Sequence, residues 1–211
     1  MKKIVMGYKN FHSNLFNKRK SFFSKLSTGQ SPEVLFITCS DSRVDPNLLT
    51  SSEPGDLFVI RNAGNIIPPH KNTSCGFAAS VEFAINAIGI KHVIICGHSD
   101  CGAMKGALDE LKVKNLPDVQ KWLNYTKPGV GYSKAKSSSI SLNDITEFTQ
   151  RNVLVQIQNL KTHPCVIEKL QTGSVDIHGW VYDIGQGYIK VFAEASKLFV
   201  PIEKYYIDLI D

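Results

Sequence analysis

The chain has 211 residues, of which 43% are hydrophobic and 20% charged, and its 24 basic and 19 acidic side chains leave a formal net charge of +5. This length suffices for one well-packed core, and no apolar stretch approaches the ~18 residues of a spanning helix, so we expect no membrane partner. The mild basic surplus forms no long stripe interleaved with aromatic residues, which argues against nucleic acid as a partner.

Residues 3–28 are predicted to be helical, because apolar side chains such as Ile4, Tyr8 and Phe11 recur at roughly helical spacing before Gly29. The segment is rich in aromatic residues and precedes the first predicted strand. We therefore expect residues 1–28 to form an N-terminal helical arm that lies at an interface between two subunits.

Three apolar runs follow, at residues 34–38, 57–60 and 92–96. None of them alternates apolar with polar residues, a pattern typical of strands that are buried on both faces in a mostly parallel sheet. Residues 74–89, 103–111 and 142–160 are predicted helices, and residues 175–182 and 188–192 a hairpin. The sequence predicts one α/β domain over residues 1–211, with a mostly parallel central sheet flanked by helices, the N-terminal arm and a C-terminal hairpin or edge strand.

The chain contains five cysteines, an odd number, and shows no export signal. A cytoplasmic protein with reduced thiols is therefore the expected class, rather than a disulfide-bonded one. Cys75, Cys96 and Cys165 are interpreted as packing residues of the core.

Two polar motifs occupy equivalent places in the predicted sheet. Cys39, Asp41 and Arg43 follow the first strand, and His98 and Cys101 follow the third. Reactive groups gather beyond the carboxyl ends of the strands in open α/β sheets, so the two motifs meet if their strands are neighbours. Two thiolates and one imidazole suit tetrahedral zinc, and three protein ligands leave the fourth position open, as in catalytic sites.

With these motifs, the chain resembles the β-class carbonic anhydrases over about residues 16–192. The resemblance rests on four co-linear segments: CSDSRVDP at 39–46, FVIRNAGN at 58–65, GHSDCGAMKG at 97–106 and HGWVYDI at 178–184. It implies reversible, zinc-dependent hydration of CO₂ to bicarbonate and a proton, by attack of zinc-bound hydroxide on CO₂, with one Zn²⁺ per chain.

The resemblance also implies roles for individual residues. Cys39, His98 and Cys101 match the zinc ligands of the family, and Asp41 and Arg43 match its catalytic dyad. The remaining matches concern the substrate: the backbone N–H of Gly102 helps to hold bicarbonate, and Gln30, Phe58 and Phe83 line the pocket. Phe83 stands where the plant-like branch usually has tyrosine. Because that branch builds its pocket where two subunits meet, a dimer or tetramer is implied.

A paired carboxylate has two uses beside such a metal. Ionised Asp41, held by Arg43, can accept the hydrogen of the attacking hydroxide, and the same pairing keeps the carboxylate off the open metal position.

Two alternative functions would use the same three metal ligands. One is hydrolysis of a CO₂ analogue, carbonyl sulfide or carbon disulfide; the other is a non-catalytic zinc or redox-sensing module, which would leave Asp41 and Arg43 without a task.

Overall fold

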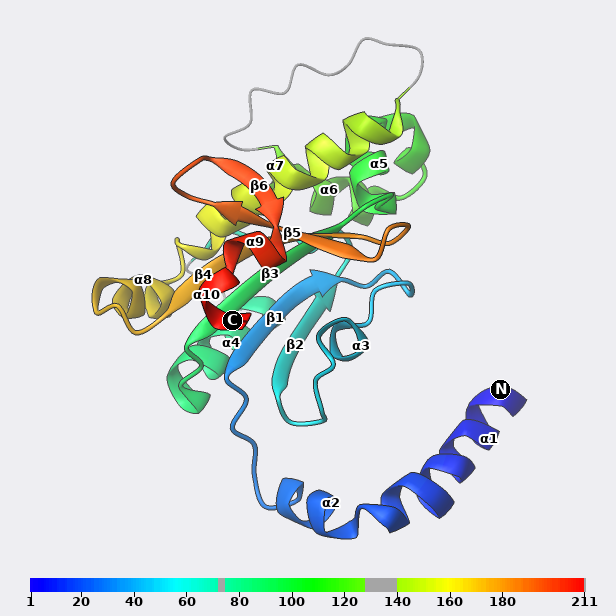
Figure 1. Ribbon diagram of the computed structural model, residues 1–211. Helices are drawn as coiled ribbons and strands as arrows, with labels where there is room; N and C mark the ends of the chain where they lie inside the picture. Colours follow the sequence, from blue (N-terminus) through cyan, green and yellow to red (C-terminus); the bar gives the residue numbers. More distant parts are fainter. Residues whose placement is uncertain (72–74, 128–139, 211) are drawn as a thin grey trace. The chain divides into compact units, whose positions relative to one another are not determined.

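The chain divides into two units in the computed structural model, which describes residues 1–71, 75–127 and 140–210. The first unit, residues 1–31, consists of α1 (Lys2–Asn10), a π-helical stretch (Phe11–Phe16) and α2 (Lys20–Leu26), drawn in blue in Figure 1. None of its helical residues is buried, although the Phe16 and Phe23 rings pack with their centroids 5.1 Å apart. The predicted helical arm is confirmed, with a break at Arg19, where φ is −124° and ψ 31°.

The second unit is built on a six-stranded sheet of order β2-β1-β3-β4-β5-β6 (Figure 1). Its first four members run parallel: β2 (Leu57–Asn62), β1 (Val34–Cys39), β3 (His92–His98) and β4 (Asp176–Asp183). The last two, β5 (Tyr188–Ala193) and β6 (Leu198–Pro201), are antiparallel additions at one edge. The mostly parallel sheet and the C-terminal hairpin are confirmed, whereas β6 was not predicted.

The predicted helices are present. They are α4 (Gly76–Glu82) with its π-helical continuation (Phe83–Ile88), α5 (Gly102–Leu108) followed by a short 3-10 turn (Glu110–Val113), and α7 (Leu142–Leu160). The other helices and turns described in the second unit are α3 (Pro46–Thr50), α6 (Pro117–Leu123), a 3-10 turn (Asn124–Thr126), α8 (Pro164–Gln171), α9 (Ile202–Tyr205) and α10 (Ile207–Ile210). Three of these begin with proline at the first helical position, a start signal that periodicity alone does not detect.

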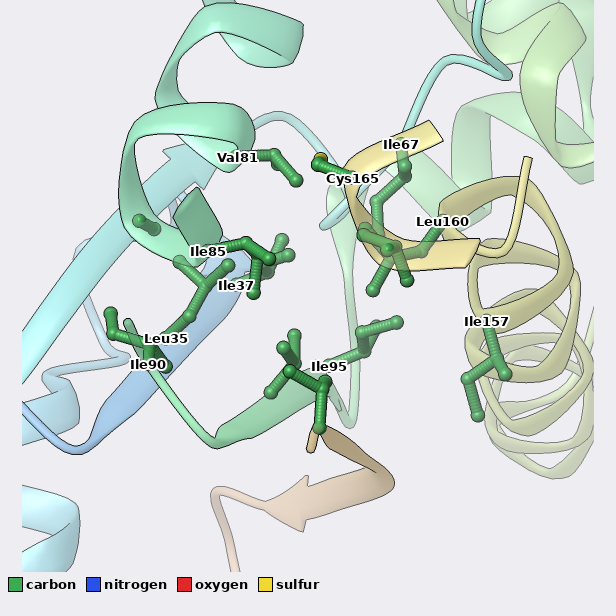
Figure 2. Packing of buried hydrophobic residues seen from close by; sticks show 14 of the residues in the cluster. Leu35, Ile37, Ile67, Val81, Ile85, Ile90, Ile95, Ile157, Leu160 and Cys165 are labelled. Atoms are coloured by element: carbon green, nitrogen blue, oxygen red, sulfur yellow. The ribbon is translucent and has the colours of Figure 1, made fainter. Parts of the chain in front are cut away.

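Alternate residues of the central strands enter two different cores, one on each face of the sheet. Leu35 and Ile37 of β1 lie in the larger core with residues of α4, α7 and α8, and Figure 2 shows part of this packing. Phe36, between them, lies in the second core with Trp180. Burial on both faces explains why these runs are apolar without alternation.

The cysteines outside the two motifs behave differently from one another. Cys96 and Cys165 are buried, as predicted, and burial raises the pKa of the Cys96 thiol to about 12. Cys75 is exposed, so its interpretation as a core residue is wrong. It precedes α4, where its Sγ atom accepts the backbone N–H of Ala78 at 3.5 Å. Among the described residues, no helix is long and apolar enough to cross a membrane.

Candidate metal centre

The three predicted metal ligands meet at the carboxyl ends of β1 and β3. The two strands are neighbours in register, with Thr38 opposite Cys96, so Cys39 and His98 leave the sheet side by side. Cys101 follows three residues later, directly before α5. The Sγ atoms of Cys39 and Cys101 lie 4.0 Å apart, and the ligand atoms of all three buried residues lie within 4.8 Å of one another.

The imidazole of His98 offers one nitrogen to this cluster. Its Nδ1 atom lies 2.8 Å from the carbonyl oxygen of Ser99. A carbonyl can only accept, so Nδ1 carries the proton and Nε2 keeps its lone pair. Nε2 is buried without a hydrogen-bond partner. An orphaned buried nitrogen is costly, and a metal ion bound to its lone pair removes that cost.

The two sulfur atoms form a coupled pair. The Cys39 Sγ atom accepts the backbone N–H groups of Gly64 at 3.3 Å and of Asp41 at 3.4 Å. A hydrogen bond from the Cys101 thiol, followed by contributions from His98 and these two amides, lowers the pKa of Cys39, against the opposing effect of burial. The same hydrogen bond, together with burial, raises the pKa of Cys101. The site thus favours a thiolate at Cys39 before any metal binds.

The donor set fits zinc in chemistry and in spacing. Zn–S bonds of about 2.3 Å at tetrahedral angles place two sulfur atoms about 3.8 Å apart, close to the 4.0 Å between Cys39 and Cys101. Two thiolates and an imidazole are the soft and intermediate ligands that zinc accepts. The residues present therefore fit this metal.

Asp41 and Arg43 form a fork-like pair beside the cluster. The Nε and Nη2 atoms of Arg43 donate to the two carboxylate oxygens of Asp41 at 3.0 and 2.8 Å. This pairing with the guanidinium lowers the pKa of Asp41, which therefore stays ionised. The Oδ2 atom of Asp41 lies 3.9 Å from Nε2 of His98, so the carboxylate faces the position of the metal.

Arg61 braces the loop that carries the pair, a role the sequence analysis did not predict. Its Nε atom donates to the carbonyl of Cys39 at 3.0 Å, and its Nη2 atom donates to the carbonyls of Asp41 and Val44, both at 2.8 Å. The available signal was its position near the end of β2, the strand beside β1. Neighbouring parallel strands end together, so an arginine there reaches the loop after β1.

Gly102 is the first residue of α5 and follows Cys101, one of the predicted ligands. It is exposed, and a Cβ atom added to it would meet nothing within 4 Å. Its backbone N–H belongs to the first turn of the helix, where the amides have no partner within the helix. The predicted anion contact thus has open space around it.

The structure does not bring the predicted pocket aromatics to the cluster of the same chain. Phe58 pairs with Leu35 and Asn62 with Cys39, so Phe58 lies four residues, or about 13 Å, back along the sheet. The ring of Phe83 lies beside it, with centroids 6.3 Å apart. Gln30 belongs to the first unit, and its role in the pocket stays a prediction.

Comparisons with known proteins agree over most of the chain. A family model described as carbonic anhydrase matches residues 34–189. The carbonic anhydrase of Pseudomonas aeruginosa is 41% identical over 205 residues, covering 97% of this chain and 93% of that protein. Carbonic anhydrase 1 of Escherichia coli O157:H7 is 44% identical over 202 residues, covering 96% and 92%. The solved β-carbonic anhydrase CcaA superposes with a TM-score of 0.86 at 39% identity, covering 95% and 91%.

Proposed function

The chain belongs to the β-class carbonic anhydrases, and from that premise we propose which of its residues carry out the reaction. It is a zinc enzyme that catalyses the reversible hydration of CO₂ to bicarbonate and a proton. One observation supports the assignment most: three buried soft and intermediate ligand atoms lie within 4.8 Å of one another, beside an ionised Asp–Arg pair.

We assign Cys39, His98 and Cys101 as the protein ligands of one Zn²⁺ per chain. The orphaned Nε2 atom of His98 and the 4.0 Å separation of the two sulfur atoms support this assignment. When bound, zinc lowers the pKa of a coordinated water from about 15.7 to roughly 7 in the best-characterised case, so a strong nucleophile exists at neutral pH.

Asp41 orients the attacking oxygen. Its Oδ2 atom accepts the remaining hydrogen of that oxygen, which turns an oxygen lone pair toward the carbon of CO₂. Arg43 keeps the carboxylate ionised and occupies both of its oxygens, so Asp41 is held away from the metal. The new C–O bond forms as one C=O π pair moves onto oxygen, which gives bicarbonate.

Gly102 holds the product. We assign its backbone N–H as a donor to a bicarbonate oxygen, because this amide lies in the first turn of α5 next to Cys101. The positive end of a helix favours an anion, and the missing side chain allows close approach.

The substrate pocket is completed by a second subunit. Phe58 lies about 13 Å along the sheet from its own chain's cluster, with the Phe83 ring beside it, so in this proposal the two line the pocket of the partner. Gln30, in the first unit, is assigned to a partner's pocket on the resemblance alone. The N-terminal arm contributes to the same interface, since none of its helical residues is buried. A dimer is the smallest assembly that meets this requirement. A solved relative with 31% identity comes from a study of two tetrameric β-carbonic anhydrases of Sordaria macrospora.

We place the enzyme in the cytoplasm. All five cysteines are free thiols, and four of them are buried, which suits a reducing compartment.

The direct test is stopped-flow CO₂ hydration with protein of measured zinc content, before and after chelation. We expect turnover to follow zinc content and to return when zinc is restored. Rates with carbonyl sulfide and carbon disulfide, measured in parallel, distinguish hydration from hydrolysis of an analogue. Zinc-loaded protein that leaves CO₂ unhydrated would overturn the assignment.

A further inference from the structure

Arg43 binds a second carboxylate on the side away from Asp41. Its Nη1 atom donates to the Oδ2 atom of Asp100 at 3.1 Å, and its Nη2 atom donates to the backbone carbonyl of Asp100 at 3.3 Å. The Nε and Nη2 atoms meanwhile donate to Asp41. One guanidinium therefore joins two carboxylates that come from different strand ends, after β1 and after β3.

The backbone holds Asp100 in an unusual conformation. Its φ is +57°, in the left-handed region that non-glycine residues rarely adopt, at a cost of about 1 kcal/mol. It lies between His98 and Cys101, so the same turn that presents two metal ligands also presents this carboxylate. Such strain persists only where the surroundings enforce it, and it is common at functional sites.

Lys105 supplies the fourth charge of the group. Its Nζ atom pairs with the Oδ1 atom of Asp100 from α5, four residues after Cys101. Two carboxylates, Asp41 and Asp100, are thus balanced by two cations, Arg43 and Lys105. The arrangement is a chain of three ion pairs, Asp41–Arg43, Arg43–Asp100 and Asp100–Lys105, rather than one isolated pair.

We propose that Asp100 is a positioning residue, which holds the Arg43 guanidinium in the orientation that keeps Asp41 paired and off the metal. The catalytic consequence rests on the proposed function. The reason is exposure: the Arg43 side chain is 44% exposed, and a single exposed ion pair is weak because water competes for both partners. Contacts on both sides restrict movement of the guanidinium more than the fork with Asp41 does alone.

The test compares Asp100→Asn with wild type in the zinc-loaded enzyme. Asparagine tolerates the left-handed conformation and keeps an oxygen acceptor, so the turn is preserved while the charge is lost. Asp109→Asn is the matched control. Like Asp100, Asp109 pairs with a lysine, Lys112, but it does not contact Arg43; its carboxylate instead accepts the backbone N–H of Leu111 at 3.1 Å.

Two readouts are needed. The first is hydrogen exchange of the Arg43 Nε–H by ¹⁵N NMR, which is assignable because the chain has four arginines. The second is the kcat and KM of CO₂ hydration. In Asp100→Asn we expect exchange to accelerate about fivefold and kcat to fall roughly three- to tenfold, with KM little changed. Lys105→Met should have a smaller effect on both, and Asp109→Asn none.

Unchanged Arg43 exchange in Asp100→Asn would overturn the proposal, whatever happens to activity. The same holds if zinc content falls while exchange stays constant, since Asp100 would then act on Cys101. Faster exchange with unchanged kcat would remove any role in the reaction. If the wild-type protein does not hydrate CO₂, the proposed function fails, and the exchange comparison still decides whether Asp100 holds Arg43.

Discussion

The Oδ2 atom of Asp41 lies 3.9 Å from the Nε2 atom of His98, the one ring nitrogen that the fold leaves without a partner. A carboxylate this close to a metal position is itself a potential ligand. What holds it back is the pair of hydrogen bonds from Arg43, at 3.0 and 2.8 Å. The catalytic role proposed for Asp41 therefore depends on its neighbour two residues along the chain.

Replacing Arg43 with alanine should inactivate the enzyme without removing its metal. The freed Asp41 carboxylate is expected to turn onto the metal, and CO₂ hydration should fall about a hundredfold or more. Arg43→Lys keeps the charge but loses the planar fork, so it should retain an intermediate rate. Zinc content tests whether the metal is retained, and kcat/KM tests the loss of activity. X-ray absorption at the zinc edge tests whether Asp41 binds the metal. Wild-type turnover in Arg43→Ala would show that the role given to Arg43 is wrong.

Replacing Cys101, a proposed zinc ligand, with serine should remove zinc and activity together. Serine offers a hard, protonated oxygen in place of a soft thiolate, and three-point binding becomes two-point binding. We expect zinc stoichiometry near zero after dialysis and at least about a hundredfold loss of hydration rate. Cys75→Ser is the control, because Cys75 is exposed and lies outside the cluster. This variant should keep its zinc and its hydration activity. Full zinc content in Cys101→Ser would contradict the ligand assignment.

The stability of the fold should decline toward acid pH partly because of His163. This side chain is 2% exposed, and its Nε2 atom lies 3.0 Å from the carbonyl oxygen of Pro68. Its ring contacts that of His70 edge-on, with centroids 5.6 Å apart. Burial, and to a lesser degree His70, lowers its pKa below the usual value. The native state therefore keeps His163 neutral, while the unfolded chain takes up a proton once the pH drops below about 6.5. Stability present above that pH is lost as the pH falls.

Urea unfolding at pH 7.5 and 5.5 measures this effect. In His163→Gln the loss of stability between the two pH values should be smaller than in wild type, even though the variant costs about 1 kcal/mol at pH 7.5. The loss of stability between the two pH values should not vanish in this variant, because burial also lowers the pKa of His178. His12→Gln, in the exposed N-terminal arm, should parallel wild type. An identical pH dependence in His163→Gln and wild type would rule out this contribution.

The sequence was sufficient for the sheet and the ligands, and insufficient for the contacts around them. Cys39 and His98 could be predicted to converge because parallel strands end at one edge, so two polar motifs after buried runs must meet there. The contact of Asp100 with Arg43 could not be predicted, because it depends on the positive φ of Asp100, which the residue type does not determine. The three carbonyls bound by Arg61 likewise depend on the path of a loop, not on a pattern.

Mixing two inactive variants should restore activity if the pocket draws residues from both subunits. Asp41→Ala damages a chain's own site, whereas Gln30→Ala is expected to damage the site of its partner. In a randomly assembled dimer of the two, half of the molecules are mixed and each has one intact site, so about a quarter of the wild-type rate should return. A mixture of Asp41→Ala with Arg43→Ala is the control, because both belong to the same chain's site and should not complement. No recovery in the first mixture would contradict the shared pocket.

Gly102 allows its backbone N–H to be removed with little else changed. It occupies the first position of α5, where proline is tolerated because that amide is not needed within the helix. The preceding residue, Cys101, already has φ −65° and ψ 123°, which proline demands of its neighbour. Gly102→Pro should therefore fold and bind zinc normally, yet lower kcat/KM for bicarbonate dehydration about 10- to 100-fold through loss of the donor.

Gly102→Ala separates the donor from the space around it. Alanine keeps the N–H, and its Cβ atom would meet nothing within 4 Å, so kcat/KM should stay within about threefold of wild type, the effect of one added methyl in an open site. Dehydration kinetics, zinc content and circular dichroism on the two variants complete the comparison. If Gly102→Pro and Gly102→Ala turn over bicarbonate equally well, the amide does not hold the anion. If both are impaired alike, the open volume beside Cys101, and not the N–H group, is what the substrate requires.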